Sequence, residues 1–275
     1  GFDVRGNGST EVGVVAANFP FAVSWDGGGG DLLWTTPGNW STDQLPLANA
    51  NVSISSAGTD TISLTSGIHD ILSLTMPVDD SLSISAATLN IANASTINSN
   101  LTISNAAALL DVGGTLDVIG ALNLRQGSLT VSGLTTVTGL TTWNAPSNGS
   151  AQNFLLDGLG AFNANGGFEL GSLLSGDTLT LNKVLTISGS NSWSSSGTNF
   201  GDNNISGTGS IINGGTQTLS NTVALNINVP FTNSATTGVL TKGSGAGNVI
   251  FTNSLTNNGI INVDVGIMEL RGGAT

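Results

Sequence analysis

Four consecutive glycines, Gly27–Gly30, are the first residues of the chain whose type and spacing suggest chemistry. A glycine-rich loop can hold a phosphate through its backbone N–H groups, and a P-loop then requires a Lys and a Ser or Thr directly after the last glycine. Here Asp31 and Leu32 follow, and no helical periodicity comes after them. Because the carboxylate of Asp31 would repel a phosphate, the sequence argues against nucleotide binding at this loop.

Three tryptophans, Trp25, Trp34 and Trp40, stand around these glycines. Aromatic faces can stack on sugar rings, so the three residues are a candidate carbohydrate-binding platform. Their apolar area can also close the end of a β structure, whose exposed interior and unpaired strand edges invite aggregation. We predict the structural cap, and we keep the sugar platform as the alternative.

Acidic residues supply oxygen ligands of the kind that calcium takes. Asp26 and Asp31 flank the glycines, and Asp202 precedes two asparagines. The EF-hand pattern and the glycine-rich repeat of calcium-binding β-rolls are both missing from the sequence. We therefore expect no cofactor, and one calcium ion at Asp26 and Asp31, or at Asp202, is the alternative.

The histidine and the paired aspartates give little support to catalysis. His69 is the single histidine, and no Gly-x-Ser-x-Gly elbow accompanies it, so neither a hydrolase triad nor a zinc site is indicated. Asp79 and Asp80 are adjacent, and neighbours on a strand point to opposite faces rather than toward one glycosidic bond. We predict that the chain is not an enzyme; a polysaccharide lyase or glycoside hydrolase on a β-helix scaffold is the alternative.

Charge and composition restrict the partners. The net charge is −12 and charged residues make up 8% of the 275 residues. No basic patch can form from cations this scattered, so we expect neither nucleic acid nor an anionic membrane surface as a partner. No apolar run is long enough to predict a membrane-spanning helix, and there is no cysteine. The five cations are Arg5, Arg125, Lys183, Lys242 and Arg271.

The dominant pattern from Asn51 onward is a triplet of apolar, small polar and apolar residues, as in Leu82-Ser83-Ile84 and Leu101-Thr102-Ile103. An alternation with period two predicts a strand, and Gly, Asn, Ser and Asp between the triplets predict tight turns. We predict an all-β protein: a single elongated right-handed parallel β-helix of roughly a dozen coils, each of roughly 18 to 22 residues. Stacked turn asparagines should form amide ladders. Tandem antiparallel β-sandwiches are the alternative fold.

The triplet rhythm also predicts an organisation along the chain. We expect an N-terminal segment with the Trp/Gly-rich cap at 1–50 and a first β-helix array at 51–142. An irregular insert or seam follows at 143–177, with Phe154, Phe162 and Phe168 as core residues of wide coils or as part of a recognition loop. A second array at 178–275 is expected to continue beyond the chain end.

The repeats resemble a known class of proteins. The segment FTNSLTNNGIINVDVGIMELRGGAT and the opening Trp-Asp-Gly-Gly-Gly-Gly followed by Asn39-Trp40 and Leu45-Pro46 are similar to β-helical repeats of large secreted bacterial surface proteins. These include autotransporter passengers and filamentous-haemagglutinin-like adhesins. The resemblance implies an extracellular or cell-surface location and a role as a non-catalytic stalk or adhesive passenger. The partners that it implies are glycans, host or neighbour cell surfaces, and further repeats of the same polypeptide; a carbohydrate-binding module is the alternative.

Binding to ice or to another crystalline surface would require regular rows of threonine. Pairs such as Thr59 with Thr61 and Thr178 with Thr180 are spaced too irregularly along the sequence to predict such a row. We therefore expect no activity of this kind.

Overall fold

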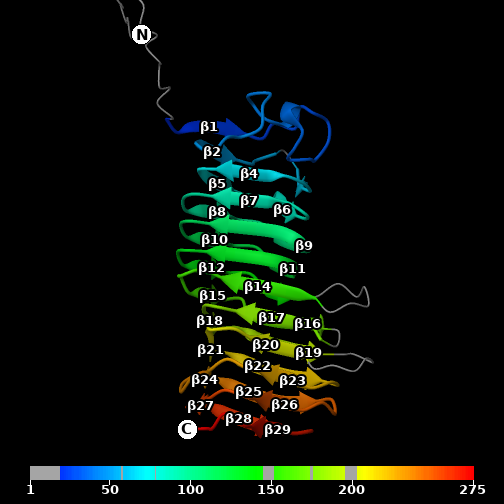
Figure 1. Cartoon of the computed structure of the whole chain (residues 1–275), viewed down its shortest axis with the longest axis vertical. Coiled ribbons are helices and arrows are strands. Elements are labelled where there is room, and N and C mark those ends of the chain that lie inside the picture. The colour runs from blue at the N-terminus through cyan, green and yellow to red at the C-terminus, as the bar shows by residue number, and fades with distance from the viewer. Residues whose placement is uncertain (1–18, 57, 78, 145–151, 174–175, 196–202) are drawn as a thin grey trace, which may run out of the picture.

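The computed structural model describes residues 19–56, 58–77, 79–144, 152–173, 176–195 and 203–275, and the protein is an elongated parallel β-solenoid (Figure 1). Strands account for 55% of the chain and helix for 1%, and the solenoid makes about nine turns. The single helical element among the described residues is a 3-10 turn, η1 (Pro37–Asn39). The strands lie on three faces, and each paired strand contacts a strand one coil away in parallel orientation. The predicted β-helix is therefore confirmed, and the antiparallel sandwich alternative is wrong.

Each face collects one strand from successive coils. Face 1 consists of β1 (Phe21–Ser24), β2 (Ala50–Ser53), β5 (Ser73–Met76), β8 (Ser95–Ile97), β10 (Leu116–Val118), β12 (Thr135–Val137), β15 (Phe162–Ala164), β18 (Val184–Ile187), β21 (Ser210–Asn213), β24 (Phe231–Asn233) and β27 (Leu255–Asn257). Face 2 consists of β3 (Thr61–Leu64), β6 (Ser81–Ile84), the first part of β9 (Leu101–Val112), the first part of β11 (Leu122–Val131), β13 (Thr141–Trp143), β16 (Phe168–Leu173), β19 (Ser190–Ser195), β22 (Thr216–Asn221), β25 (Val239–Ser244) and β28 (Ile260–Val263). Face 3 consists of β4 (Ile68–Ile71), β7 (Thr88–Ile91), the second parts of β9 and β11, β14 (Asn153–Asp157), β17 (Thr178–Leu181), β20 (Asn203–Ser206), β23 (Leu225–Ile227), β26 (Val249–Phe251) and β29 (Met268–Leu270).

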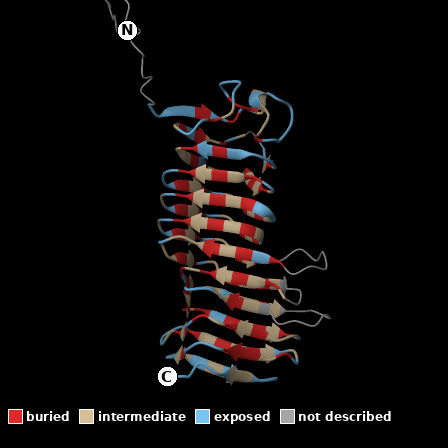
Figure 2. Cartoon of the chain, in the orientation of Figure 1, coloured by how far each residue is buried: buried red, intermediate tan, exposed pale blue. Residues whose placement is uncertain are grey.

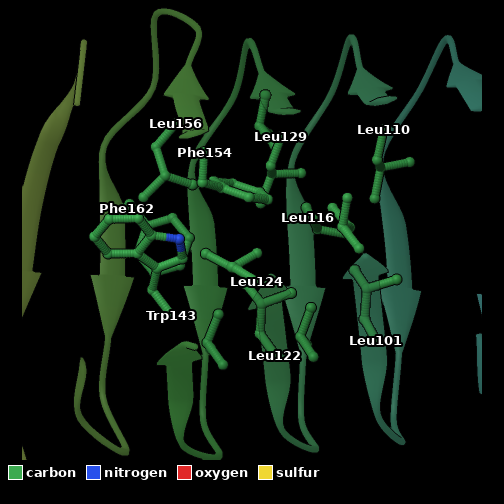
Figure 3. Packing of buried hydrophobic residues seen from close by; sticks show 14 of the residues in the cluster. Leu101, Leu110, Leu116, Leu122, Leu124, Leu129, Trp143, Phe154, Leu156 and Phe162 are labelled. Atoms are coloured by element: carbon green, nitrogen blue, oxygen red, sulfur yellow. The ribbon is translucent and has the colours of Figure 1, made fainter. Parts of the chain in front are cut away.

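The triplets place one row of apolar side chains inside the solenoid and one polar row outside. In β6, Leu82 and Ile84 are fully buried while Ser81 and Ser83 are half-buried. The strand below aligns Leu101 with Leu82, so the interior residues stack in columns along the axis. Figure 2 shows this alternation as buried bands that recur from coil to coil. One continuous hydrophobic core results, and Figure 3 shows its leucines and aromatic rings between neighbouring coils.

Strands β9 and β11 run through the corner between faces 2 and 3 without interruption. Their register shifts at the bend, between Leu124 and Gln126 and between Gln126 and Ser128. Gly127 allows this bend because its φ is +111° and a Cβ there would lie 2.4 Å from the carbonyl oxygen of Ala108. Faces 2 and 3 are thus joined into one sheet at these two coils.

Coil length varies more than the triplet spacing predicts. Leu116 pairs with Thr135, which lies 19 residues further on, and Thr135 pairs with Phe162, which lies 27 residues further on. Longer coils mean fewer coils for the same chain, which explains about nine turns instead of roughly a dozen. The strand ladders on the three faces stay in register across these coils.

The described residues of 143–177 stack in the same columns as their neighbours. Phe162 pairs with Thr135 above and Leu185 below. Phe154, Phe162 and Phe168 are all completely buried, which confirms that they are core residues of wide coils. Residues 145–151 lie outside the described residues.

The predicted amide ladder is present toward the C-terminal end of the solenoid. The side-chain nitrogen of Asn213 donates to Oδ1 of Asn233 at 2.9 Å, and that of Asn233 donates to Oδ1 of Asn257 at 2.8 Å. Asn213 and Asn233 are fully buried, and both also donate to backbone carbonyls of the next coil. These bonds pair the amides of the last residues of β21, β24 and β27.

Candidate functional site

The three tryptophans of the N-terminal region form one buried cluster. Trp25 and Trp40 contact edge to face with ring centroids 5.1 Å apart, and Trp34 and Trp40 do so at 4.8 Å. The indole N–H of Trp40 donates to the carbonyl oxygen of Trp34 at 2.8 Å. Trp34 and Trp40 are completely buried and Trp25 is 4% exposed. Their ring faces are therefore packed against protein, and a sugar could stack on them only after this segment had opened.

This cluster lies over the first complete coil. The backbone of residues 32–34 pairs with β3, because Ser63 donates to Leu32 at 2.8 Å and accepts from Trp34 at 3.0 Å. Strand β1 covers the edge of β2 in the same way. We call residues 21–40 the lid, since they cover strand edges and core at this end of the solenoid (Figure 1).

The glycine run brings two parts of the lid into close contact. A Cβ on Gly29 would lie 2.6 Å from Cγ2 of Thr36 and 2.7 Å from Oδ1 of Asn39. Asn39 is fully buried and connects the lid: its Oδ1 accepts from the N–H of Gly29, and its nitrogen donates to Oδ1 of Asp31 and to the carbonyl of Leu33. The glycines thus permit a close approach of the two parts of the lid. The sequence did not predict that Asn39 would connect the lid. Its position beside Trp40 is the only sequence feature that pointed to it.

The acidic residues of the lid are engaged by protein donors. Asp26 accepts from the N–H of Gly28 at 3.0 Å. Asp31 accepts from the N–H of Leu33, from the hydroxyl of Thr36 and from the amide of Asn39, and these bonds, led by that of Leu33, lower the pKa of its carboxyl group. An open groove of about 510 Å³ runs beside them and is also lined by Asp60. One calcium ion at Asp26 and Asp31 stays the alternative to the prediction of no cofactor, and Asp202 lies outside the described residues.

Asp79 and Asp80 are separated by burial rather than brought together. Asp79 is exposed with a φ of +61°, whereas Asp80 is completely buried. Asp80 accepts from the backbone N–H and the hydroxyl of Ser56 and from the backbone N–H of Asp60. Oγ of Ser56 also lies 2.9 Å from a carboxylate oxygen of Asp60. These contacts fix a corner of the coil above β6, which is a structural role for Asp80.

His69 belongs to the core beneath the lid. It is 9% exposed, its ring centroid lies 6.3 Å from that of Trp34, and its Nε2 lies 3.0 Å from the carbonyl oxygen of Ser66. That carbonyl can only accept, so Nε2 carries the proton. Among the described residues, no three His, Cys, Asp or Glu side chains are grouped closely enough to hold a metal ion.

Two of the five cations are buried, which the sequence did not predict: Lys183 lies in the corner between β17 and β18, and Lys242 points inward from β25. Nζ of Lys183 donates to the carbonyl of Val131 at 3.2 Å, and desolvation lowers its pKa to about 8 although Asp157 acts in the opposite direction. Lys242 is completely buried and donates to the carbonyls of Ser244 and Gly245; burial lowers its pKa as well. Both ammonium groups pair with backbone carbonyls and so are satisfied in place.

The outer side of face 1 carries a row of side chains, one from each coil, which are short and polar except for Ile212. The strand registers align these residues one above another, at about 4.8 Å per coil. We call this set the face 1 row; it contains a single charged residue, Asp117. The row consists of Ser53, Thr75, Thr96, Asp117, Thr136, Asn163, Thr186, Ile212, Thr232 and Thr256.

The threonine spacing along the chain predicted no regular row of threonine, and the face 1 row is indeed interrupted by Asp117, Asn163 and Ile212. It nevertheless aligns distant threonines: Thr136 and Thr186 share one column although 50 residues separate them. Coils of unequal length hide this alignment in the sequence. The side chains of the row are exposed or half-buried, so the hydroxyl groups of its serine and threonines are accessible to solvent.

Comparison with protein-family models, with curated proteins and with solved structures gives no match for this chain. In the part of the chain that the structure describes, no helix has the length and apolar character needed to cross a bilayer. The lid, the core and the face 1 row are therefore the features of the molecule that bear on its function.

Proposed function

We propose that this chain is a non-catalytic segment of an extracellular or cell-surface protein that serves as a rigid stalk or as an adhesive passenger. The observation that carries the proposal is the stacking of strands in register along the whole described solenoid. Each coil contributes one outward side chain to the face 1 row. The finer resemblance to autotransporter passengers and filamentous-haemagglutinin-like adhesins is part of this proposal.

The continuous core supports the stalk. Each coil buries its apolar side chains against the coils above and below, so stability is close to a sum of neighbouring contacts and bending would break several of them at once. At about 4.8 Å per coil, about nine turns extend roughly 45 Å. A chain of this kind places whatever it carries at a defined distance from its anchor.

The face 1 row supports the role of an adhesive passenger. Hydroxyl and amide groups repeat at the strand spacing on face 1, and all residues of the face 1 row except Asp117 are uncharged. Neutral polysaccharides offer hydroxyl groups with a regular repeat, which such a row can contact by many weak hydrogen bonds. Affinity then arises from the number of simultaneous contacts and not from one deep pocket.

Binding assays with variants of the face 1 row distinguish the two roles. An adhesive passenger should give saturable binding to a neutral glycan or to cells, and T136K together with T186K should weaken it because both long side chains stand out of the row. The matched control is S83K together with N123K, which places the same two charges, also two coils apart, on the outer side of face 2. A stalk should show no saturable binding in either form.

Two results would contradict the proposal as a whole. A scattering curve that indicates a compact sphere would remove the rod on which both roles depend. Reproducible depolymerisation of a polysaccharide, lost in H69A or D80A variants that still fold, would favour the enzyme alternative.

A further inference from the structure

Face 2 carries a polar groove that extends over three successive coils. Strands β16, β19 and β22 pair in sequence here (Figure 1), and the groove beside them has a volume of about 390 Å³. It is lined by outward side chains of these strands, by Asn191, and by Leu140 from the corner before β13. Sites for small molecules usually have volumes of about 300–1,000 Å³, so the groove is large enough for one.

The wall of this groove presents hydroxyl groups in a regular array. Ser190 is in register with Thr216, and Ser192 is in register with Thr218, at a strand spacing of about 4.8 Å. All four side chains are exposed or half-buried. In the part of the chain that the structure describes, none of their hydroxyl groups forms a hydrogen bond with the protein. The array is therefore available to donate to and accept from a ligand.

Glu169 adds one carboxylate to this array. It precedes Leu170, which pairs with Trp193, so Glu169 lies beside Ser192 on the outer side of the sheet. Among the described residues, its side chain has neither a hydrogen-bond partner nor an ion-pair partner. A free carboxylate can accept hydrogen bonds from two hydroxyl groups of a ligand, and it repels a ligand that is itself an anion.

Asn191 supplies an independent indication of a ligand at this place. Its Nδ2 and Oδ1 atoms are both buried and have no hydrogen-bond partner among the described residues, and the same holds for the amide of Gln217, which is in register with it. The next residue of this column, Leu240, is completely buried. Two polar residues thus replace apolar ones at a cost in stability, which is typical of a functional position. One hydroxyl group of a ligand can donate to Oδ1 of Asn191 and accept from Nδ2.

We propose that this groove binds one sugar residue of a neutral glycan; the inference rests on the proposed role as an adhesive passenger and gives it a site apart from the face 1 row. Hydroxyl groups of the sugar bond to Glu169, to Asn191 and to the hydroxyl array. The C–H groups of the ring contact Leu140, which is 37% exposed. Because Glu169 carries a negative charge, the groove selects against sugars with a carboxylate or a sulfate group.

Titration of the intact ¹⁵N-labelled chain with cellotriose, maltotriose and mannotriose tests the proposal. At least one of these neutral trisaccharides should shift the side-chain amide resonances of Asn191 in a saturable manner. E169A should weaken this binding at least tenfold, because hydrogen bonds to a charged acceptor are lost. The matched control is D264A, which removes the same charge from an exposed residue after β28 and should bind like wild type. The remaining resonances report whether each variant keeps its fold.

Two further measurements separate the groove from the face 1 row. T136K with T186K should leave the shift of Asn191 unchanged, because neither residue lines the groove. Trigalacturonate should bind at least tenfold more weakly than the best neutral trisaccharide, because its carboxylates meet that of Glu169.

Three results would overturn the groove as a sugar site. The first is equal weakening by E169A and D264A, and the second is tighter binding of trigalacturonate. The third is a shift of Asn191 with none of the neutral trisaccharides. If T136K with T186K still weakens binding to a polysaccharide in that case, the groove alone is refuted and the adhesive passenger stands. If no saturable binding occurs in any form, the adhesive passenger falls with it.

Discussion

The indole nitrogen of Trp40 lies 2.8 Å from the carbonyl oxygen of Trp34, to which it donates a hydrogen bond inside a completely buried cluster. This bond links the 3-10 turn region to the segment that pairs with β3. The lid is thus held to the first coil by packing and by a satisfied polar group together.

Trp40→Ala should destabilise the lid strongly. Removing a buried tryptophan leaves a cavity and typically costs about 3–5 kcal/mol. We expect an earlier denaturant-unfolding transition, followed by tryptophan fluorescence, and faster aggregation of the exposed first coil. F19A is the matched control, because Phe19 is 74% exposed and its loss should change little. Loss of saturable sugar binding by W40A at unchanged stability would favour the carbohydrate platform instead.

Gly29→Ala should loosen the loop of the lid. The added Cβ would lie 2.6 Å from Thr36 and 2.7 Å from the amide oxygen of Asn39, so the loop must shift and weaken its bonds to Asn39. The expected cost is about 1–3 kcal/mol in denaturant unfolding. G58A is the control, since the nearest atoms to its Cβ are 3.9 Å away. Equal stability of both variants would show that the close approach is not required.

Asn233→Ala should break the amide ladder at its centre. The variant leaves the side-chain nitrogen of Asn213 and the carbonyl of Ile260 without one of their partners. Buried polar groups that lose a partner cost about 1–3 kcal/mol each. Thermal unfolding should begin earlier in N233A and remain unchanged in N258A, whose side chain is exposed. A neutral N233A would mean that the ladder contributes little to stability.

The two lysines should make the protein more stable as the pH rises through the alkaline range. The pKa of Lys183 is lowered from 10.5 to about 8 in the folded state, so below pH 8 both states are protonated and the burial cost is fully present. Between about pH 8 and 10.5 the unfolded chain holds a proton that the folded chain has released, and stability rises by an amount on the order of 2 kcal/mol.

Because of the composition, few other side chains titrate in the pH range in which this rise in stability is measured. The chain contains no tyrosine and no cysteine, and its only lysines are Lys183 and Lys242. The rise should be smaller in K183M and nearly absent when K242M is added, since burial lowers the pKa of Lys242 too. An unchanged rise in the double variant would assign it to another group.

Calcium should have little effect on the lid. The carboxylate oxygens of Asp31 already accept from Leu33, Thr36 and Asn39. We expect the same melting temperature in excess calcium and in a chelator, and a lower one for D31A, which loses these three acceptor bonds. A calcium-dependent increase that D26A and D31A abolish would instead establish the ion site.

The sequence by itself determined the class of fold and indicated which residues form the lid. Triplets such as Leu82-Ser83-Ile84 assign one side of each strand to the core, because successive side chains on a strand point to opposite faces. The tryptophans beside four glycines indicated an end cap, because they place a large apolar area next to a flexible backbone. These features depend on residues that are near one another in the chain.

The tertiary structure alone decided which distant residues share a column. Thr136 and Thr186, or Asn213 and Asn233, align only because the corners between them have particular lengths, and these lengths vary from coil to coil. The burial of Lys183 likewise depends on the carbonyl of Val131, 52 residues away. Register along the axis is a sum over all intervening turns, so no short stretch of sequence contains it.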